Sequence, residues 1–168
     1  MHIMDKTPIS TKPTDGPDQD LILDPQLDLN VAMCTCASLR KTTRVVTQLF
    51  DAALKPVGLT PGQFTVLAAL SRIGEQPQTK LAEKLLMDRT TMIRNLRPLE
   101  DKGFVETDRS GIRGAKVLRL TDDGRQALET ALPHWQQAQS QIVNALGAAR
   151  WGGLITDLGA TVEAVQQL

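Results

Sequence analysis

The sequence predicts a mainly α-helical fold with a small two- or three-stranded β wing, and three observations carry this prediction. The chain of 168 residues is 41% apolar but only 3% aromatic, with no Tyr, so its core must rest on aliphatic side chains and Met, which favour helices. Apolar residues recur at helical spacing over most of the chain. Two strand-like runs, 104–107 and 116–120, flank a Gly-containing turn.

The N-terminal part of the chain divides into an arm and a helix. Residues 1–26 are rich in Pro, Asp, Thr and Gly, and we expect them to form a disordered or loosely docked arm. The rest, residues 27–168, is expected to be one domain. Its first helix is expected from about Leu29 to Val57, with Gly58 ending it.

The next helix begins with a clear capping signal. Thr60 is the expected N-cap, Pro61 takes the first helical position and Gln63 completes a capping box. We expect this helix to end at Gly74. Its expected buried side chains are Phe64, Leu67, Leu70 and Ile73.

Two further helices precede the hairpin and two follow it. The first, about Gln78 to Leu86, is expected to turn four side chains inward: Leu81, Ala82, Leu85 and Leu86. The second runs from about Arg89 to Lys102, between Asp88 as N-cap and Gly103. After the hairpin, Thr121 caps a helix to about Leu146, which Pro133 should bend or break, and a last helix covers about Ala148 to Gln167.

The helix after Asp88 has two chemically different faces. At about 100° per residue, four residues share the inward direction of Leu96: Met92, Ile93, Leu99 and Gly103. The remaining surface carries hydroxyl, amide and guanidinium groups: Thr90, Thr91, Arg94, Asn95 and Arg97. Such groups read bases in the major groove of DNA, Arg from guanine and Asn from adenine. The alternative is an ordinary solvated helix face.

The distribution of charge supports a contact with a polyanion. The net charge is zero, yet residues 89–119 hold eight basic and four acidic side chains, whereas residues 1–30 and 120–168 are acidic. Chance clustering on a solvated surface is the alternative. The order of helices followed by a basic hairpin, whose turn carries Arg109 and Arg113, is that of a winged helix-turn-helix. The turn is placed to reach the minor groove or its phosphates.

With these elements in place, the chain from about Cys34 to Leu146 resembles the MarR family of transcriptional regulators. The matching segments are Leu81-Ala82-Glu83, Asp88-Arg89-Thr90-Thr91, Arg94-Asn95-Leu96, Leu99-Glu100, Lys102-Gly103-Phe104-Val105 and Leu120-Thr121-Asp122-Asp123-Gly124. The resemblance implies an obligate homodimer that places two winged domains on a near-palindromic operator in double-stranded DNA, most often as a repressor. It also implies that residues 60–121 form the winged domain. The implied DNA-binding residues are Thr90, Thr91, Arg94, Asn95 and Arg97 in the recognition helix, with Arg109 and Arg113 in the wing.

The terminal segments are expected to be dimerisation helices. Residues 27–58 and 122–168 offer more apolar surface than a winged domain of about 60 residues covers, and self-association would bury it. The alternative is a closed monomer in which these helices pack within one chain.

Regulation is expected to act through the first helix. In the resembled family a small anionic or aromatic effector usually releases the DNA, and Arg40 and Arg44, one turn apart, are the candidate effector-binding residues. A surface or phosphate-facing role is the alternative for both. Cys34 and Cys36 are candidate redox residues, although the simpler interpretation makes them small packing residues.

The sequence gives no support to an enzyme, a cofactor or a metal site. It contains no Gly-rich phosphate loop, no nucleophile elbow and no His–carboxylate grouping, and its two Cys and two His do not complete a tetrahedral set. No apolar run approaches the roughly 20 residues of a membrane span, so we expect a cytoplasmic protein. The main rival function is a winged-helix protein-interaction module that does not bind DNA.

Overall fold

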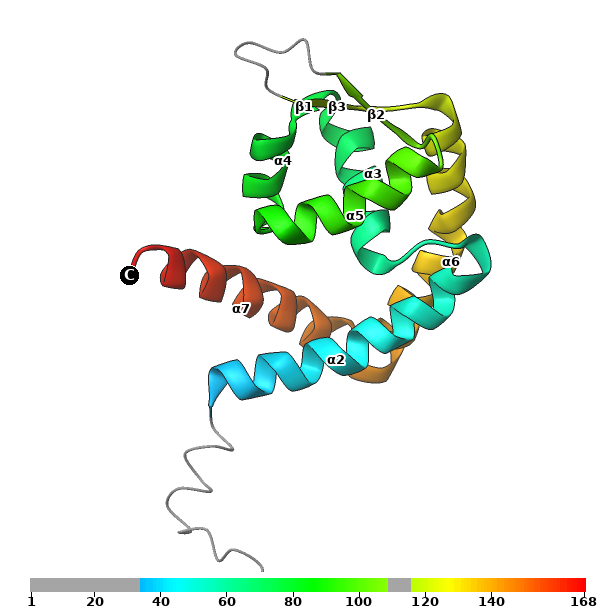
Figure 1. The fold of residues 1–168 in the computed structure, drawn as a ribbon. Helices are drawn as coiled ribbons and strands as arrows, with labels where there is room; N and C mark the ends of the chain where they lie inside the picture. Colours follow the sequence, from blue (N-terminus) through cyan, green and yellow to red (C-terminus); the bar gives the residue numbers. More distant parts are fainter. Residues whose placement is uncertain (1–33, 109–115) are drawn as a thin grey trace, which may run out of the picture. The chain divides into compact units, whose positions relative to one another are not determined.

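The computed structural model describes residues 34–108 and 116–168, and it confirms a mostly helical fold with a small sheet (Figure 1). In chain order its elements are α2 (Thr35–Leu54), a short 3-10 helix η1 (Lys55–Val57), α3 (Pro61–Ile73), β1 (Gln76–Pro77), α4 (Gln78–Lys84), α5 (Arg89–Asp101), β2 (Val105–Asp108), β3 (Val117–Leu120), α6 (Asp122–Leu146) and α7 (Ala148–Gln166). The expected arm, residues 1–26, lies outside the described residues.

The chain divides into two compact units, residues 1–41 and 42–168. The described part of the first unit, residues 34–41, is the start of α2. All other elements belong to the second unit.

The predicted capping signals are confirmed by their hydrogen bonds. The Thr60 hydroxyl accepts from the Gln63 backbone N–H at 3.3 Å, and the Gln63 side chain accepts from the Thr60 N–H at 3.0 Å. The Thr121 hydroxyl likewise accepts from the Gly124 N–H at 3.0 Å. Each bond satisfies a backbone donor that the first turn of a helix leaves unpaired, so α3 and α6 begin where the sequence predicts.

The hydrophobic core is centred on α3, which packs against α5, α6 and β3 (Figure 1). Its fully buried side chains come from α2, α3, α4, α5 and β3: Leu54, Val66, Leu67, Leu70, Leu81, Met92, Leu99 and Leu118. Phe64 of α3 stacks on Trp135 of α6 with ring centroids 5.7 Å apart. This core fixes α5 on one side of α3. The face of α5 that points away from the core is not covered by the described chain.

The sheet has three antiparallel strands in the order β1-β3-β2. The predicted hairpin is confirmed, with Val105 opposite Leu120. The sequence allows for a third strand without locating it; this strand is β1, which pairs Gln76 with Leu118 and therefore ties the start of α4 to the hairpin.

Three side chains predicted to point inward are exposed instead. Ile73 is 37% exposed, Ile93 42% and Leu86 60%, so these predictions are wrong. Ile73 is the last residue of α3, and α4 ends at Lys84 before Leu86, whose φ of 52° turns the chain out of the helix. The sequence predicts that Pro133 bends or breaks its helix; Pro133 does not break it, because α6 continues through it.

Candidate nucleic-acid interface

The first turn of α5 is held by Asp88. One carboxylate oxygen accepts the Thr91 backbone N–H at 2.8 Å, and the other accepts the Thr91 hydroxyl at 2.6 Å. Both hydrogen bonds from Thr91 hold the pKa of Asp88 below its usual value, and the bond from the hydroxyl has the larger effect. The carboxylate is therefore ionised at neutral pH, and it fixes both the start of α5 and the rotamer of Thr91.

The inward face of α5 is defined by Met92, Leu96 and Leu99, which are all buried. Pro98 lies inside the helix without ending it, and Lys102 caps the C-terminal end. Gly103, with φ of 70°, then lets the chain reverse into β2, a backbone conformation that suits glycine. Gly103 itself is exposed and not part of the inward face, which corrects its predicted placement.

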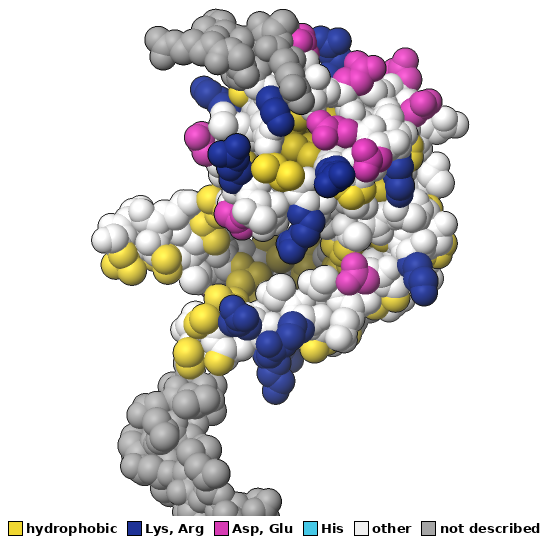
Figure 2. Space-filling model, in the orientation of Figure 1, with side chains coloured by type: hydrophobic (Ala, Val, Ile, Leu, Met, Phe, Trp, Pro, Cys, Tyr) yellow, Lys and Arg dark blue, Asp and Glu magenta, His cyan; other side chains and the backbone are white. Residues whose placement is uncertain are grey.

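The outward face of α5 carries the residues predicted to read DNA. Thr90, Arg94 and Arg97 are exposed, whereas Thr91 is half-buried and its hydroxyl donates to Asp88. Figure 2 shows Lys and Arg side chains spread over the face formed by α4 and α5. The wing residues Arg109 and Arg113 lie outside the described residues.

Asn95 has a different environment from its neighbours on α5. It is half-buried, and its amide donates to the Thr91 carbonyl at 3.0 Å and approaches the Met87 sulfur at 3.9 Å. It also lies against α3, because a Cβ added to Gly62 would stand 2.5 Å from the Asn95 Oδ1. Gly62 therefore makes the room in which Asn95 joins α5 to α3.

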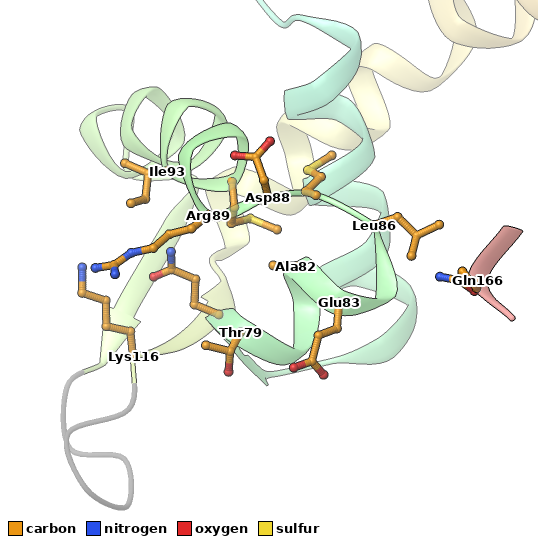
Figure 3. A pocket seen from close by; sticks show the side chains of 12 residues that line it. Thr79, Ala82, Glu83, Leu86, Asp88, Arg89, Ile93, Lys116 and Gln166 are labelled. Atoms are coloured by element: carbon orange, nitrogen blue, oxygen red, sulfur yellow. The ribbon is translucent and has the colours of Figure 1, made fainter. Parts of the chain in front are cut away.

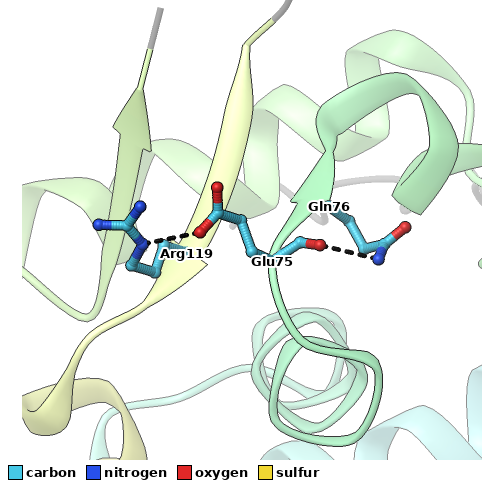
Figure 4. A network of polar contacts seen from close by, with 3 residues as sticks. All are labelled: Glu75, Gln76 and Arg119. Atoms are coloured by element: carbon cyan, nitrogen blue, oxygen red, sulfur yellow. Dashed lines mark hydrogen bonds and ion pairs between the residues drawn. The ribbon is translucent and has the colours of Figure 1, made fainter. Parts of the chain in front are cut away.

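An ion pair joins the base of the hairpin to the turn before α4 (Figure 4). The Arg119 Nε donates to the Glu75 carboxylate at 2.9 Å, across from β3 to the residue before β1. The hydrogen bond and the charge of Glu75 raise the pKa of Arg119 above its ordinary value. Both side chains are about half exposed, so the pair orients the strand edges more than it stabilises them.

The effector and redox candidates lie on α2. Arg40, in the first unit, and Arg44, in the second, are both exposed. Cys34 and Cys36 are free and exposed, so the chain itself does not bury them as packing residues. Cys34 precedes the helix and its carbonyl accepts the Ser38 N–H at 3.0 Å.

Metal-ligating clusters and membrane-spanning helices are absent from the described residues. Within residues 34–108 and 116–168, no three His, Cys, Asp or Glu side chains gather as a metal ion would require. None of the described helices combines the length and apolar character of a bilayer crossing.

Known proteins resemble this chain in both sequence and fold. The MarR family model matches residues 59–110. An uncharacterized HTH-type transcriptional regulator of Bacillus cereus is 33% identical over 102 residues, which cover 61% of this chain and 68% of that protein. The M. tuberculosis transcriptional regulator MosR, solved in complex with DNA, is 31% identical with a TM-score of 0.72, over 80% of this chain and 97% of MosR.

The chain belongs to the MarR family. It is therefore a transcriptional regulator with a DNA-binding winged-helix fold. A further member of known structure is the transcriptional repressor CouR bound to a 23-mer DNA duplex, which is 27% identical with a TM-score of 0.72 over 79% of this chain and 95% of CouR. CouR has also been solved bound to p-coumaroyl-CoA. The family identity argues against an enzyme.

Two cations near α5 were not singled out from the sequence of this MarR-family chain. Arg89 is the first residue of α5, and Lys116 is the residue before β3; both are exposed. The only available signal was their position directly beside predicted element ends. That signal is weak, because it does not reveal that residues 27 apart in the chain line the same hollow.

Proposed function

We propose that the chain is a homodimeric repressor that binds a near-palindromic operator through α5 and the wing and leaves it when a small effector binds. One observation carries the DNA-binding part: α5 buries Met92, Leu96 and Leu99 while Arg94 and Arg97 stand exposed on its other side. A helix seated in this way enters the major groove with its side chains directed at base edges.

The proposed contacts divide into base reading and backbone positioning. Arg94, Arg97 and Thr90 are exposed and read bases or touch phosphates from the groove. The Thr91 hydroxyl donates to Asp88, and Asn95 donates to the Thr91 carbonyl and lies against α3. Their proposed part in binding therefore includes holding α5 in position. Arg109 and Arg113, in the wing, are proposed to meet the minor groove or its phosphates.

The homodimer is supported by apolar surface on α7. This helix has no buried residue, and five large aliphatic side chains along it are between 37% and 61% exposed: Leu154, Ile155, Leu158, Val162 and Val165. Their spacing of three and four residues, apart from one adjacent pair, places them on one helix face. We propose that residues 27–58 and 122–168 bury such surface against a second copy and so set two α5 helices about 34 Å apart, one turn of duplex.

The proposed release of DNA by an effector is supported by a relative that binds a small molecule and by two arginines on α2. The family member CouR is known bound to p-coumaroyl-CoA. We propose that this chain likewise binds a small anionic or aromatic molecule, with Arg40 and Arg44 as candidate partners of its carboxylate or phosphate groups. The molecule releases DNA only if it prefers the geometry that does not bind the operator.

The DNA-binding proposal is tested by anisotropy titrations against the DNA that flanks the protein's own gene, at fixed salt. Arg94→Ala is expected to weaken specific binding by about 1–3 kcal/mol and to relax base preference, whereas Arg113→Ala weakens binding to all sequences alike. Arg125→Ala, an exposed arginine on α6, is the matched control and should change nothing. If neither Arg94→Ala nor Arg113→Ala alters binding, the groove assignment is wrong.

The effector proposal is tested by repeating the titration with aromatic acids and p-coumaroyl-CoA. Release of DNA by one of these probes, weakened in Arg44→Ala, supports an effector site at α2. Release that Arg44→Ala does not affect refutes the assignment of this residue, and the absence of release across the panel refutes the proposed effector class.

A redox-sensing function is the second candidate, because Cys34 and Cys36 are exposed. Cys34 stands directly before α2 and is accessible to peroxide. Mild peroxide should then add mass to the protein and lower its DNA affinity, and Cys34→Ser should abolish both effects. DNA affinity that survives stoichiometric oxidation excludes this function.

A further inference from the structure

Two cations from different elements line one hollow beside the recognition helix. The hollow is about 860 Å³ in volume and is bordered by α4, the start of α5 and Lys116. Arg89 enters it from the first position of α5. Figure 3 shows the Arg89 guanidinium and the Lys116 ammonium group extending toward the same side of the hollow.

Both cations are attached to backbone that is held in place. Arg89 follows Asp88, whose carboxylate locks the first turn of α5 through Thr91. The carbonyl of Lys116 accepts the backbone N–H of Gln78 at 2.8 Å, which joins the start of β3 to the start of α4. Their relative placement is therefore a property of the fold and not of two independent surface loops.

Neither cation is neutralised within the chain as described. Within residues 34–108 and 116–168, Arg89 and Lys116 take part in no ion pair, and the pair of Arg119 with Glu75 involves neither of them. Two carboxylates border the hollow, but Asp88 is engaged by Thr91, and Figure 3 shows Glu83 on another side, away from Arg89 and Lys116. Two like charges that converge without a carboxylate repel each other, and a shared anion relieves this repulsion.

The position of Arg89 on α5 identifies the kind of anion. Five residues separate Arg89 from Arg94, which at about 100° per residue puts them about 140° apart around the helix. When Arg94 faces the base edges, Arg89 points away from them. It lies at the first position of α5, where the unpaired N–H groups of a helix N-terminus favour an anion such as a backbone phosphate. The forked guanidinium of Arg and the point charge of Lys are both suited to phosphate oxygens.

We propose that Arg89 and Lys116 together hold one backbone phosphate of DNA at the edge of the groove that α5 reads. This inference rests on the proposed function. The pair positions the duplex between α5 and the base of the wing, and it contributes affinity without base preference.

The test is the salt dependence of binding to the operator and to an unrelated duplex. The slope of log affinity against log salt changes by about 0.9 for each phosphate contact. The double variant Arg89→Gln/Lys116→Gln should therefore make this negative slope shallower by about 0.9 on both duplexes. The ratio of the affinity for the operator to the affinity for the unrelated duplex should stay unchanged. Arg119→Gln is the control: it removes one positive charge from β3, at a side chain that Glu75 already neutralises, and its slope should equal that of the wild type.

Three results would overturn the shared phosphate. A slope change of about 1.8 means two separate phosphates, no change means no contact, and a loss confined to the operator means base reading. A wild type that binds neither duplex with salt dependence refutes the proposed function itself. A salt-dependent wild type with an unchanged double variant refutes this inference alone. Because both side chains are exposed, circular dichroism should show the fold retained in every variant.

Discussion

The contact between Gly62 and Asn95 predicts a substitution whose effect changes sign with its background. In Gly62→Ala the new Cβ would lie 2.5 Å from the Asn95 Oδ1 and 3.0 Å from its Cγ and Nδ2. The three atoms nearest to the new Cβ all belong to this one side chain, so Asn95 must leave its position, and its hydrogen bond to the Thr91 carbonyl is lost.

The magnitude follows from three contributions to the free energy of unfolding. The lost hydrogen bond costs about 1 kcal/mol, and a displaced rotamer costs about 1 kcal/mol more. Replacing a helical Gly by Ala returns about 0.5–1 kcal/mol, because the unfolded chain loses freedom. Gly62→Ala should thus lower the stability by about 1 kcal/mol. In an Asn95→Ala background the obstruction is gone, and the same substitution should raise it by about 0.5–1 kcal/mol.

The assay is urea unfolding of the four proteins of this double-mutant cycle, followed by circular dichroism at one protomer concentration. The fixed concentration keeps the contribution of self-association constant. We expect a coupling energy of about 2 kcal/mol between the two sites. An effect of Gly62→Ala that is equal in both backgrounds, within about 0.5 kcal/mol, would refute the proposed contact.

Three further predictions concern other parts of the fold. Gly124→Ala should destabilise the protein by about 3 kcal/mol in urea unfolding, because its Cβ would lie 2.1 Å from the backbone oxygen of Phe104; an unchanged midpoint contradicts this. Since the folded pKa of Asp88 is lowered, its ionic stabilisation is complete above its unfolded pKa of about 3.9 and is lost as the pH falls through the folded value. The melting temperature of the wild type relative to Asp88→Asn should therefore be constant above about pH 5 and fall below pH 4, and a difference independent of pH would exclude this role. Ile155→Asp should raise the dimer dissociation constant at least about 100-fold in sedimentation experiments. In the proposed dimer each copy buries one Ile155 side chain, and each burial stabilises the dimer by about 1.5 kcal/mol or more. Unchanged sedimentation would place the interface elsewhere.

Features governed by local chemistry were predictable from the sequence. The caps at Thr60, Asp88 and Thr121 depend on hydrogen bonds between residues three apart, and all three are present. The inward placement of Met92, Leu96 and Leu99 follows from helical periodicity alone.

Features that depend on distant partners were not predictable in this way. The strand β1 has only two residues, Gln76 and Pro77. Leu118, the partner of Gln76, lies about 40 residues away in the chain. Ile93 satisfies the inward periodicity of α5 but borders the hollow beside α4, which no pattern within α5 reveals. The environment of Asn95 depends on the absence of a side chain at Gly62, in another helix.

The central claim is that the outward face of α5 lies in a DNA groove, and site-specific cross-linking tests it most directly. A photoreactive side chain at Thr90, which is exposed on α5, should join to operator DNA at two symmetric positions about 10 base pairs apart. The same group at Thr130, exposed on α6, should give no product. Equal cross-linking from both positions, or none from position 90 on DNA that the protein binds, would contradict the claim.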